Sequence, residues 1–165
     1  MANDMEARLR RIEDQLAIYQ VVAAHPCAVD GRNSELLGEL YAEDGVYAIG
    51  EAGEAGRFEG RAAVQAMASS PMIGEMIAAG MGHIGTLPYV MIDGDRAVAT
   101  GHAMVVISAA DGFRVARLSA ARYELERHAD GDWRITLRRL HLLDGNSTAP
   151  ALLGRLTEAP EPVAA

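Results

Sequence analysis

The sequence is poor in the features that mark a secreted or membrane protein. It has a single cysteine, Cys27, so no disulfide can form within the chain, and this fits a reducing compartment. Residues 1–15 lack the apolar core of a signal peptide, and no run of about 18 apolar residues is present that could cross a membrane. From these absences we expect a cytoplasmic protein.

Positive charge is also scarce. The chain has 15 Lys and Arg residues against 23 Asp and Glu residues, which gives a net charge of −8. The basic stretches at residues 9–11 and 137–140 are too short to form the basic patch that nucleic acid and anionic membranes require. We therefore expect the partner to be a small hydrophobic molecule, and neither nucleic acid nor a membrane.

Motifs of cofactor, metal and covalent chemistry are missing as well. No glycine-rich phosphate loop follows a predicted strand, and no G-x-S-x-G sequence is present to hold a nucleophilic serine. Asp30, His83 and His102 could in principle form a metal site of one carboxylate and two imidazoles. However, the histidines show neither the H-x-H nor the H-x-x-x-H spacing of metal ligands. The sequence therefore predicts neither a cofactor nor a metal ion.

The first half of the chain has helical periodicity. The whole chain of 165 residues suits a single core, and half of its residues are apolar. Apolar residues recur at helical spacing over about 4–31, where Pro26 should kink the helix. Two shorter helices are predicted over about 32–45 and 61–70, with a short strand at 46–50 between them. Asn33 or Ser34 should cap the second helix.

The second half is punctuated by three Asp-Gly pairs, which favour the left-handed backbone of tight hairpin turns. They stand at 93–94, 111–112 and 130–131, between long runs that alternate or are continuously apolar. This spacing predicts a four-stranded antiparallel meander over about 85–143, whose long strands must twist and curl. Residues 51–60 should form a loop with a hairpin return. With three helices against the concave face, the predicted fold is an α+β cone.

Four segments carry a resemblance to a known family, and together they cover most of residues 8–146. They are RIEDQLAIYQVVAAHPCAVDGRNSELLGELYAEDGVY, FEGRAAVQAM, MGHIGTLPYVMIDGDRAVATGHAMVV and RYELERHADGDWRITLRRLHLLDGN. In this order they resemble the NTF2-like superfamily, in particular its SnoaL-like branch, which includes scytalone dehydratase, hexachlorocyclohexane dehydrochlorinase and polyketide cyclases. The resemblance implies a curled antiparallel sheet that encloses a cavity with about three N-terminal helices. It implies one domain over residues 1–146, with residues 147–165 as a C-terminal tail.

In the dehydratase and dehydrochlorinase members, an aspartate near the end of the first helix pairs with a histidine at the start of the sheet. The matching residues here are Asp30, in CAVDGRN, and His83, in MGHIGTLP. The resemblance implies that His83 is a general base, because imidazole titrates near neutral pH, and that Asp30 orients the ring and stabilises the imidazolium. Taken singly, Asp30 could be a turn residue at a helix end and His83 a structural residue at the start of a strand.

Five further residues are candidate substrate contacts: Tyr19, His25, Tyr47, His102 and Arg139. The tyrosines could polarise a substrate carbonyl or pack in the core. His25 stands where many relatives carry a tyrosine, and it would be a second imidazole in the cavity or a surface residue. His102 and Arg139 would contact substrate if their strand faces point inward. Otherwise Arg139 would pair with a glutamate on a neighbouring strand.

These observations favour a cofactor-independent lyase, a dehydratase or dehydrohalogenase acting on a small hydrophobic and even cyclic substrate. A polyketide cyclase or isomerase with the same cavity is an alternative, and so is a non-catalytic ligand-binding or assembly module. The eight methionines suit an apolar cavity lining as well as ordinary core packing. Because a long sheet needs its outer face covered, we expect a homo-oligomer, either a dimer or a trimer.

Overall fold

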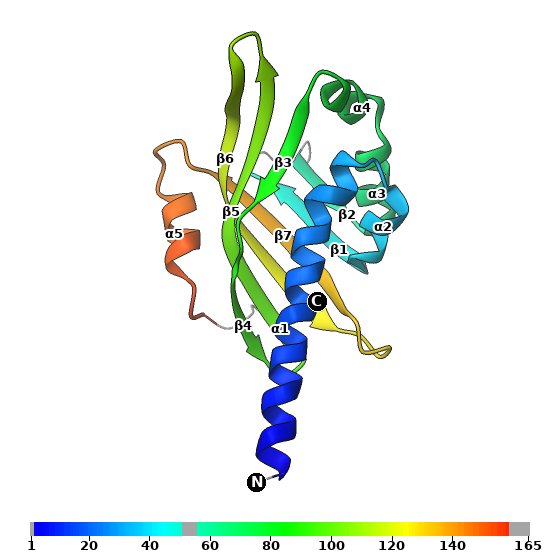
Figure 1. The fold of residues 1–165 in the computed structure, drawn as a ribbon, viewed down its shortest axis with the longest axis vertical. Helices are drawn as coiled ribbons and strands as arrows, with labels where there is room; N and C mark the ends of the chain where they lie inside the picture. Colours follow the sequence, from blue (N-terminus) through cyan, green and yellow to red (C-terminus); the bar gives the residue numbers. More distant parts are fainter. Residues whose placement is uncertain (1, 51–55, 159–165) are drawn as a thin grey trace.

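The computed structural model describes residues 2–50 and 56–158, and one curled, unclosed sheet forms its centre (Figure 1). Within these residues the sheet has seven strands in the order β2-β1-β7-β6-β5-β3, with β4 also paired to β5. The strands are β1 (Tyr41–Ile49), β2 (Arg57–Glu59), β3 (Met81–Gly85), β4 (Tyr89–Asp93), β5 (Arg96–Ala109), β6 (Gly112–Arg127) and β7 (Trp133–Leu142). All pairs are antiparallel except β1 with β7. The α+β cone expected from the sequence is confirmed.

The meander forms through the three Asp-Gly turns, as predicted. Strands β4, β5, β6 and β7 follow one another as antiparallel neighbours. The turn glycines Gly94, Gly112 and Gly131 have positive φ angles of 60°, 127° and 93°. The sequence did not predict that residues 81–93 form two strands. Pro88 lies between them and has no amide hydrogen for a ladder, and β3 and β4 pair separately with the two ends of β5.

Four helices precede or follow β1 and β2 in the first half of the chain: α1 (Ala2–Asp30), α2 (Ser34–Glu39), α3 (Arg61–Ser69) and α4 (Pro71–Ala78). Helix α1 remains helical through Pro26. Helix α2 is shorter than predicted because β1 already begins at Tyr41. Its cap is Asn33, whose side-chain oxygen accepts a 3.0 Å hydrogen bond from the Leu36 amide. Residues 56–60 of the predicted loop include β2, the hairpin return, and residues 51–55 lie outside the described residues.

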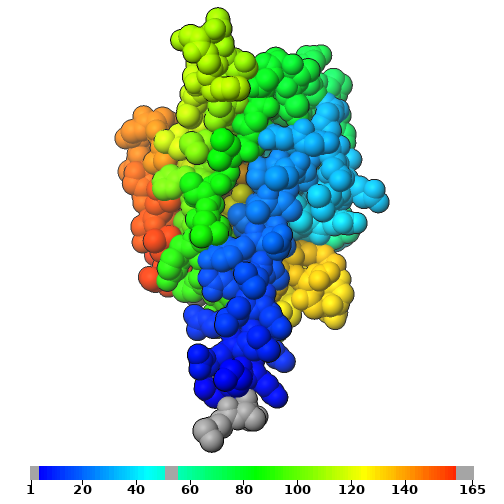
Figure 2. Space-filling model, viewed as in Figure 1, coloured from blue at the N-terminus to red at the C-terminus, as the bar shows by residue number. Residues whose placement is uncertain are grey.

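Helix α1 lies against the concave face of the sheet, and its first turns extend beyond the rest of the molecule (Figures 1 and 2). Its buried residues Ile18, Val22 and Val29 belong to the same apolar core as residues of β5, β6 and β7. A polar contact anchors the helix: Asp14 accepts hydrogen bonds from Trp133 Nε1, at 3.2 Å, and from Arg127 Nη1, at 2.7 Å. The helix therefore closes one side of the cone.

The convex face of the sheet carries a further helix, α5 (Thr148–Gly154), inside the segment that the sequence assigned to a tail (Figure 1). Its residues Ala149 and Leu152 are buried together with Ala120 of β6. The helix covers part of this face, and the expected homo-oligomer stays a prediction. No helix among the described residues is long and apolar enough to cross a membrane.

Candidate active site

A cavity of about 390 Å³ opens between the C-terminal half of α1, helices α3 and α4, and the concave face of the sheet. Most of its lining is apolar, as is usual for small-molecule sites. The lining residues are His25, Val29, Tyr47, Ile49, Phe58, Met67, Met72, Ile73, Met76, Met81, His83, Val105, Ala116 and Arg117. Four of the eight methionines therefore line this cavity, where their flexible thioethers adapt to an apolar ligand.

Asp30 is in direct contact with His83, which lines the cavity. Asp30 is the last residue of α1, and His83 lies in the middle of β3. The Asp30 Oδ1 atom is 2.6 Å from His83 Nδ1, and Oδ2 accepts a 2.7 Å hydrogen bond from the His83 backbone N–H. An ionised carboxylate only accepts hydrogen bonds, so the neutral imidazole carries its proton on Nδ1 and its lone pair on Nε2. The His83 side chain is 19% exposed and lines the cavity, so the ring is reachable by a ligand.

His25 also lines the cavity, and it lies five residues before Asp30 in α1. Its Nε2 shares a 3.0 Å hydrogen bond with the buried hydroxyl of Tyr41. The rings of Tyr41, Tyr47 and Tyr123 surround it at centroid distances of 5.9, 5.6 and 6.3 Å. Burial, and then the charges of Arg138 and His83, lower the pKa of His25 well below its ordinary value. His25 is therefore a neutral imidazole at physiological pH.

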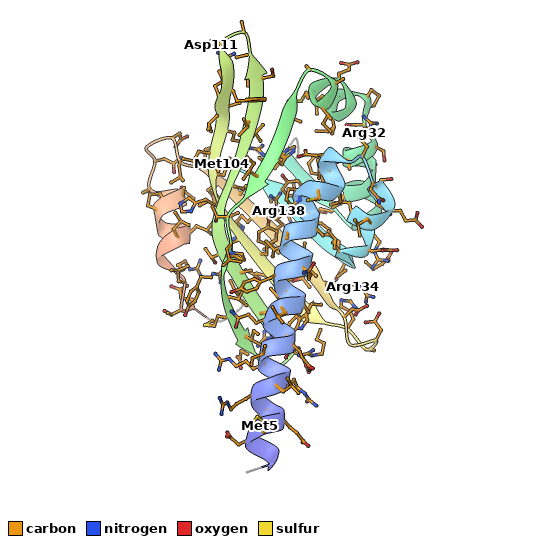
Figure 3. All side chains as sticks on the ribbon, viewed as in Figure 1. Met5, Arg32, Met104, Asp111, Arg134 and Arg138 are labelled. Atoms are coloured by element: carbon orange, nitrogen blue, oxygen red, sulfur yellow. The ribbon has the colours of Figure 1, made fainter. Side chains whose placement is uncertain are left out.

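Arg138 lies between two of these tyrosines. Tyr47 of β1 and Tyr123 of β6 stand opposite Arg138 of β7 in the sheet register, and its guanidinium carbon is 4.5 and 5.1 Å from their ring centroids. Figure 3 labels Arg138 at the centre of the molecule, beside α1. Burial alone would lower the pKa of Arg138, but the phenol oxygens of Tyr123, Tyr47 and Tyr41, together with a hydrogen bond to the Tyr123 side chain, outweigh it and raise the pKa. Arg138 thus stays charged.

A second, much smaller pocket adjoins the main cavity. It encloses about 10 Å³ and shares His25, His83 and Arg117 with the cavity. Its remaining lining residues are Pro26, Ile84, Gly85, Ala103, Met104, Tyr123 and Arg138. Arg138, Arg117 and Tyr123 were not candidates in the sequence, and only the packing of the strands brings them beside His83.

The position of Arg138 corrects the expectation for Arg139. Strands β6 and β7 pair Glu124 with Leu137 but Leu125 with Ile135, so Thr136 is an extra residue, a β-bulge. A bulge shifts the alternation by one residue. Ile135 and Arg138 both face inward, and Arg139 faces outward opposite Arg122. The expectation that Arg139 reaches the cavity is therefore wrong.

His102 and Tyr19 also lie away from the cavity. His102 is exposed and lines neither pocket. Alternation along β5 turns it to the face opposite Val105, the residue of β5 that lines the main cavity. Asp30, His83 and His102 therefore do not converge on a metal ion. Tyr19 is absent from both pocket linings, and its hydroxyl accepts a 2.7 Å hydrogen bond from Gln15 Nε2. Neither residue lines either pocket.

The neutral state of His25 predicts that acid destabilises the protein. The unfolded chain binds a proton at this histidine near pH ~6.5, whereas the folded protein does not. Its contribution to stability is thus complete above that pH and falls as the pH drops, by at most about 1.4 kcal/mol at a pH of about 5.5. Urea unfolding of wild type and His25→Gln, whose amide hydrogen-bonds but does not titrate, measures this. A stability that declines equally in both proteins would contradict the assignment.

Sequence and structure comparisons place the chain among known proteins. A family model described as a SnoaL-like domain matches residues 10–139. No protein of curated function matches the sequence. An NTF2-like protein with a cystatin-like fold from Novosphingobium aromaticivorans is 35% identical, with a TM-score of 0.86 over 93% of this chain and 97% of its own.

More distant structures share the fold. A protein of unknown function from Mycobacterium tuberculosis is 22% identical, with a TM-score of 0.68 over 91% of this chain and 89% of its own. Aln2 from a Streptomyces species is 20% identical, with a TM-score of 0.66 over 80% of this chain and 92% of its own. At such identities the likeness concerns the fold, and the chemistry must be argued from the site.

Proposed function

The chain belongs to the SnoaL-like domain family, and from this membership and the geometry of its cavity we propose that it is a cofactor-independent lyase. The substrate is a small hydrophobic molecule, for example a cyclic compound. In the reaction it loses water or hydrogen halide. The observation that carries the proposal is the Asp30–His83 contact of 2.6 Å on the wall of a mostly apolar cavity. This contact prepares Nε2 as a proton acceptor toward bound substrate.

The proposed step is a β-elimination. His83 Nε2 takes a proton from a carbon next to a carbonyl, and the C–H electron pair becomes a carbon–carbon double bond as the C–O or C–halogen bond breaks. Asp30 stabilises the imidazolium that forms. A halide leaves as the anion, whereas a hydroxyl takes the proton back from His83 and leaves as water. Tyr47 and neutral His25 contact the substrate, and the apolar lining limits competing solvent.

Substrate conversion in deuterium oxide tests the proposal. Ring-containing β-hydroxy and β-halo ketones that fit a cavity of about 390 Å³ are incubated with dialysed protein, without any added cofactor. We expect unsaturated products that lack the elements of water or hydrogen halide, and deuterium in recovered substrate if proton abstraction reverses. Products of unchanged mass would instead favour the isomerase or cyclase alternative. Binding without any conversion would favour a non-catalytic ligand-binding module.

A further inference from the structure

We propose that the substrate of this cavity carries a carboxylate, which Arg138 and Arg117 bind beside His83 while its apolar body lies among the cavity methionines. The inference rests on the proposed function, because it concerns the same cavity, and it adds the chemical class of the substrate. It makes the site selective for an organic acid. The acidic chain, with a net charge of −8, offers this acid a locally basic pocket.

The first observation is a buried cation without a counter-ion. Arg138 is 5% exposed, and its Nε and Nη1 atoms have no hydrogen-bond partner among the described residues. The ring faces of Tyr47 and Tyr123 attract the guanidinium, and the Tyr123 hydroxyl hydrogen-bonds it, but Nε and Nη1 still have no hydrogen-bond partner. A buried charge is costly unless it is paired and hydrogen-bonded. A bound anion would supply the missing acceptors.

The second observation is the space beside Arg138. The small pocket that it lines holds about 10 Å³, which is room for roughly one oxygen-sized atom. The pocket adjoins the main cavity through the shared residues His25, His83 and Arg117. One oxygen of a carboxylate fits there while the rest of the ligand stays in the larger cavity.

The third observation is Arg117, a second unpaired cation on the same wall. His83, Val105 and Arg117 stand opposite one another on β3, β5 and β6, so the arginine lies two strands from the imidazole on the concave face. Arg117 is half-buried, lines both pockets, and makes no ion pair with a described carboxylate. Neither lining contains Asp or Glu, and the nearby Asp30 is engaged by His83.

These cations are permanent, and this favours a permanent anion. Arginine stays protonated at all physiological pH values, and the tyrosines around Arg138 raise its pKa further. An oxygen that becomes anionic only during the reaction would leave both charges unneutralised in the bound ground state. A carboxylate neutralises them on binding and offers two acceptor oxygens.

Calorimetric binding of 2-naphthoate and its neutral counterpart 2-naphthamide tests the inference without turnover. We expect wild type to bind naphthoate about 10- to 100-fold more tightly than the amide, the range expected for hydrogen bonds to a charged group. Arg138→Met and Arg117→Met should each lose most of this preference. Arg139→Met, the matched variant of the outward-facing neighbour, should keep it. Equal binding of the two probes by wild type overturns the inference.

Two further measurements distinguish a carboxylate site from a structural role of Arg138 and from a phenolate site. Arg138→Met should unfold at the same temperature as wild type or higher, because it removes an uncompensated buried charge. If it fails to fold, Arg138 is structural and the inference is overturned. Binding of 2-naphthol as its fluorescent phenolate, without a preference for naphthoate, would assign the site to a phenolate and also overturn it. If wild type prefers naphthoate but catalyses no elimination, only the proposed function is defeated. If it catalyses elimination but shows no preference for naphthoate, only this inference is defeated.

Discussion

Replacing His83 by alanine should lower kcat/KM for the elimination by about 10²- to 10⁴-fold, the usual contribution of a general base. His83 is the imidazole whose Nδ1 is held by Asp30 at 2.6 Å and whose Nε2 remains free to accept a proton. His25, the other imidazole of the cavity, shares its Nε2 with Tyr41 and cannot replace it without breaking that bond. Initial rates on the substrate that wild type converts fastest measure the loss.

Two controls separate a lost base from a damaged fold. His102→Ala removes an exposed imidazole from the opposite face of the sheet, so its rate should equal that of wild type. Added imidazole should restore part of the activity of His83→Ala, because the truncated side chain leaves room at the cavity wall. Unchanged turnover in His83→Ala would rule out the proposed mechanism, even if substrate still binds.

Replacing Asp30 by asparagine should also lower kcat/KM by about 10²- to 10⁴-fold, for a different reason. The amide oxygen of asparagine can still accept from the His83 backbone N–H, so the geometry is kept. Its NH₂ group, however, donates to Nδ1 and moves the ring proton to Nε2. The imidazole then presents a proton to the substrate where the reaction requires a lone pair.

Nitrogen chemical shifts of His83 measure this change of tautomer directly, alongside the rates. Asp44→Asn, at an exposed position of β1, is the matched control and should behave as wild type. The double variant Asp30→Asn/His83→Ala should be no slower than His83→Ala alone, because the aspartate acts only through the histidine. Additive losses would show that Asp30 has a separate role.

Local sequence patterns predicted much of the fold. The three Asp-Gly pairs predicted the meander because a positive φ at the second residue is a property of glycine itself. The helical spacing of apolar residues over 4–31 predicted α1, although Ile12 and Leu16 of that pattern are exposed in the structure. The split of residues 81–93 into β3 and β4 was missed, because it depends on how both strands pair with β5.

The candidate site was likewise predicted only in part from the sequence. Family resemblance pointed to Asp30 and His83, which are 53 positions apart and meet in the structure, while their catalytic roles remain predictions. Strand alternation alone led to His102 and Arg139, and both face away from the cavity. Alternation states which residues share a face but not which face is inside.

By itself the sequence determined the long first helix, the three Asp-Gly turns and the acidic, disulfide-free character of the chain, because these depend on neighbouring residues and on composition. The tertiary structure decided which arginine faces inward. The extra residue Thr136 shifts the phase of β7, and a bulge is defined only by the pairing of two strands. That shift turns Arg138 toward the cavity and Arg139 toward the outer face, so two adjacent and chemically identical side chains receive opposite surroundings.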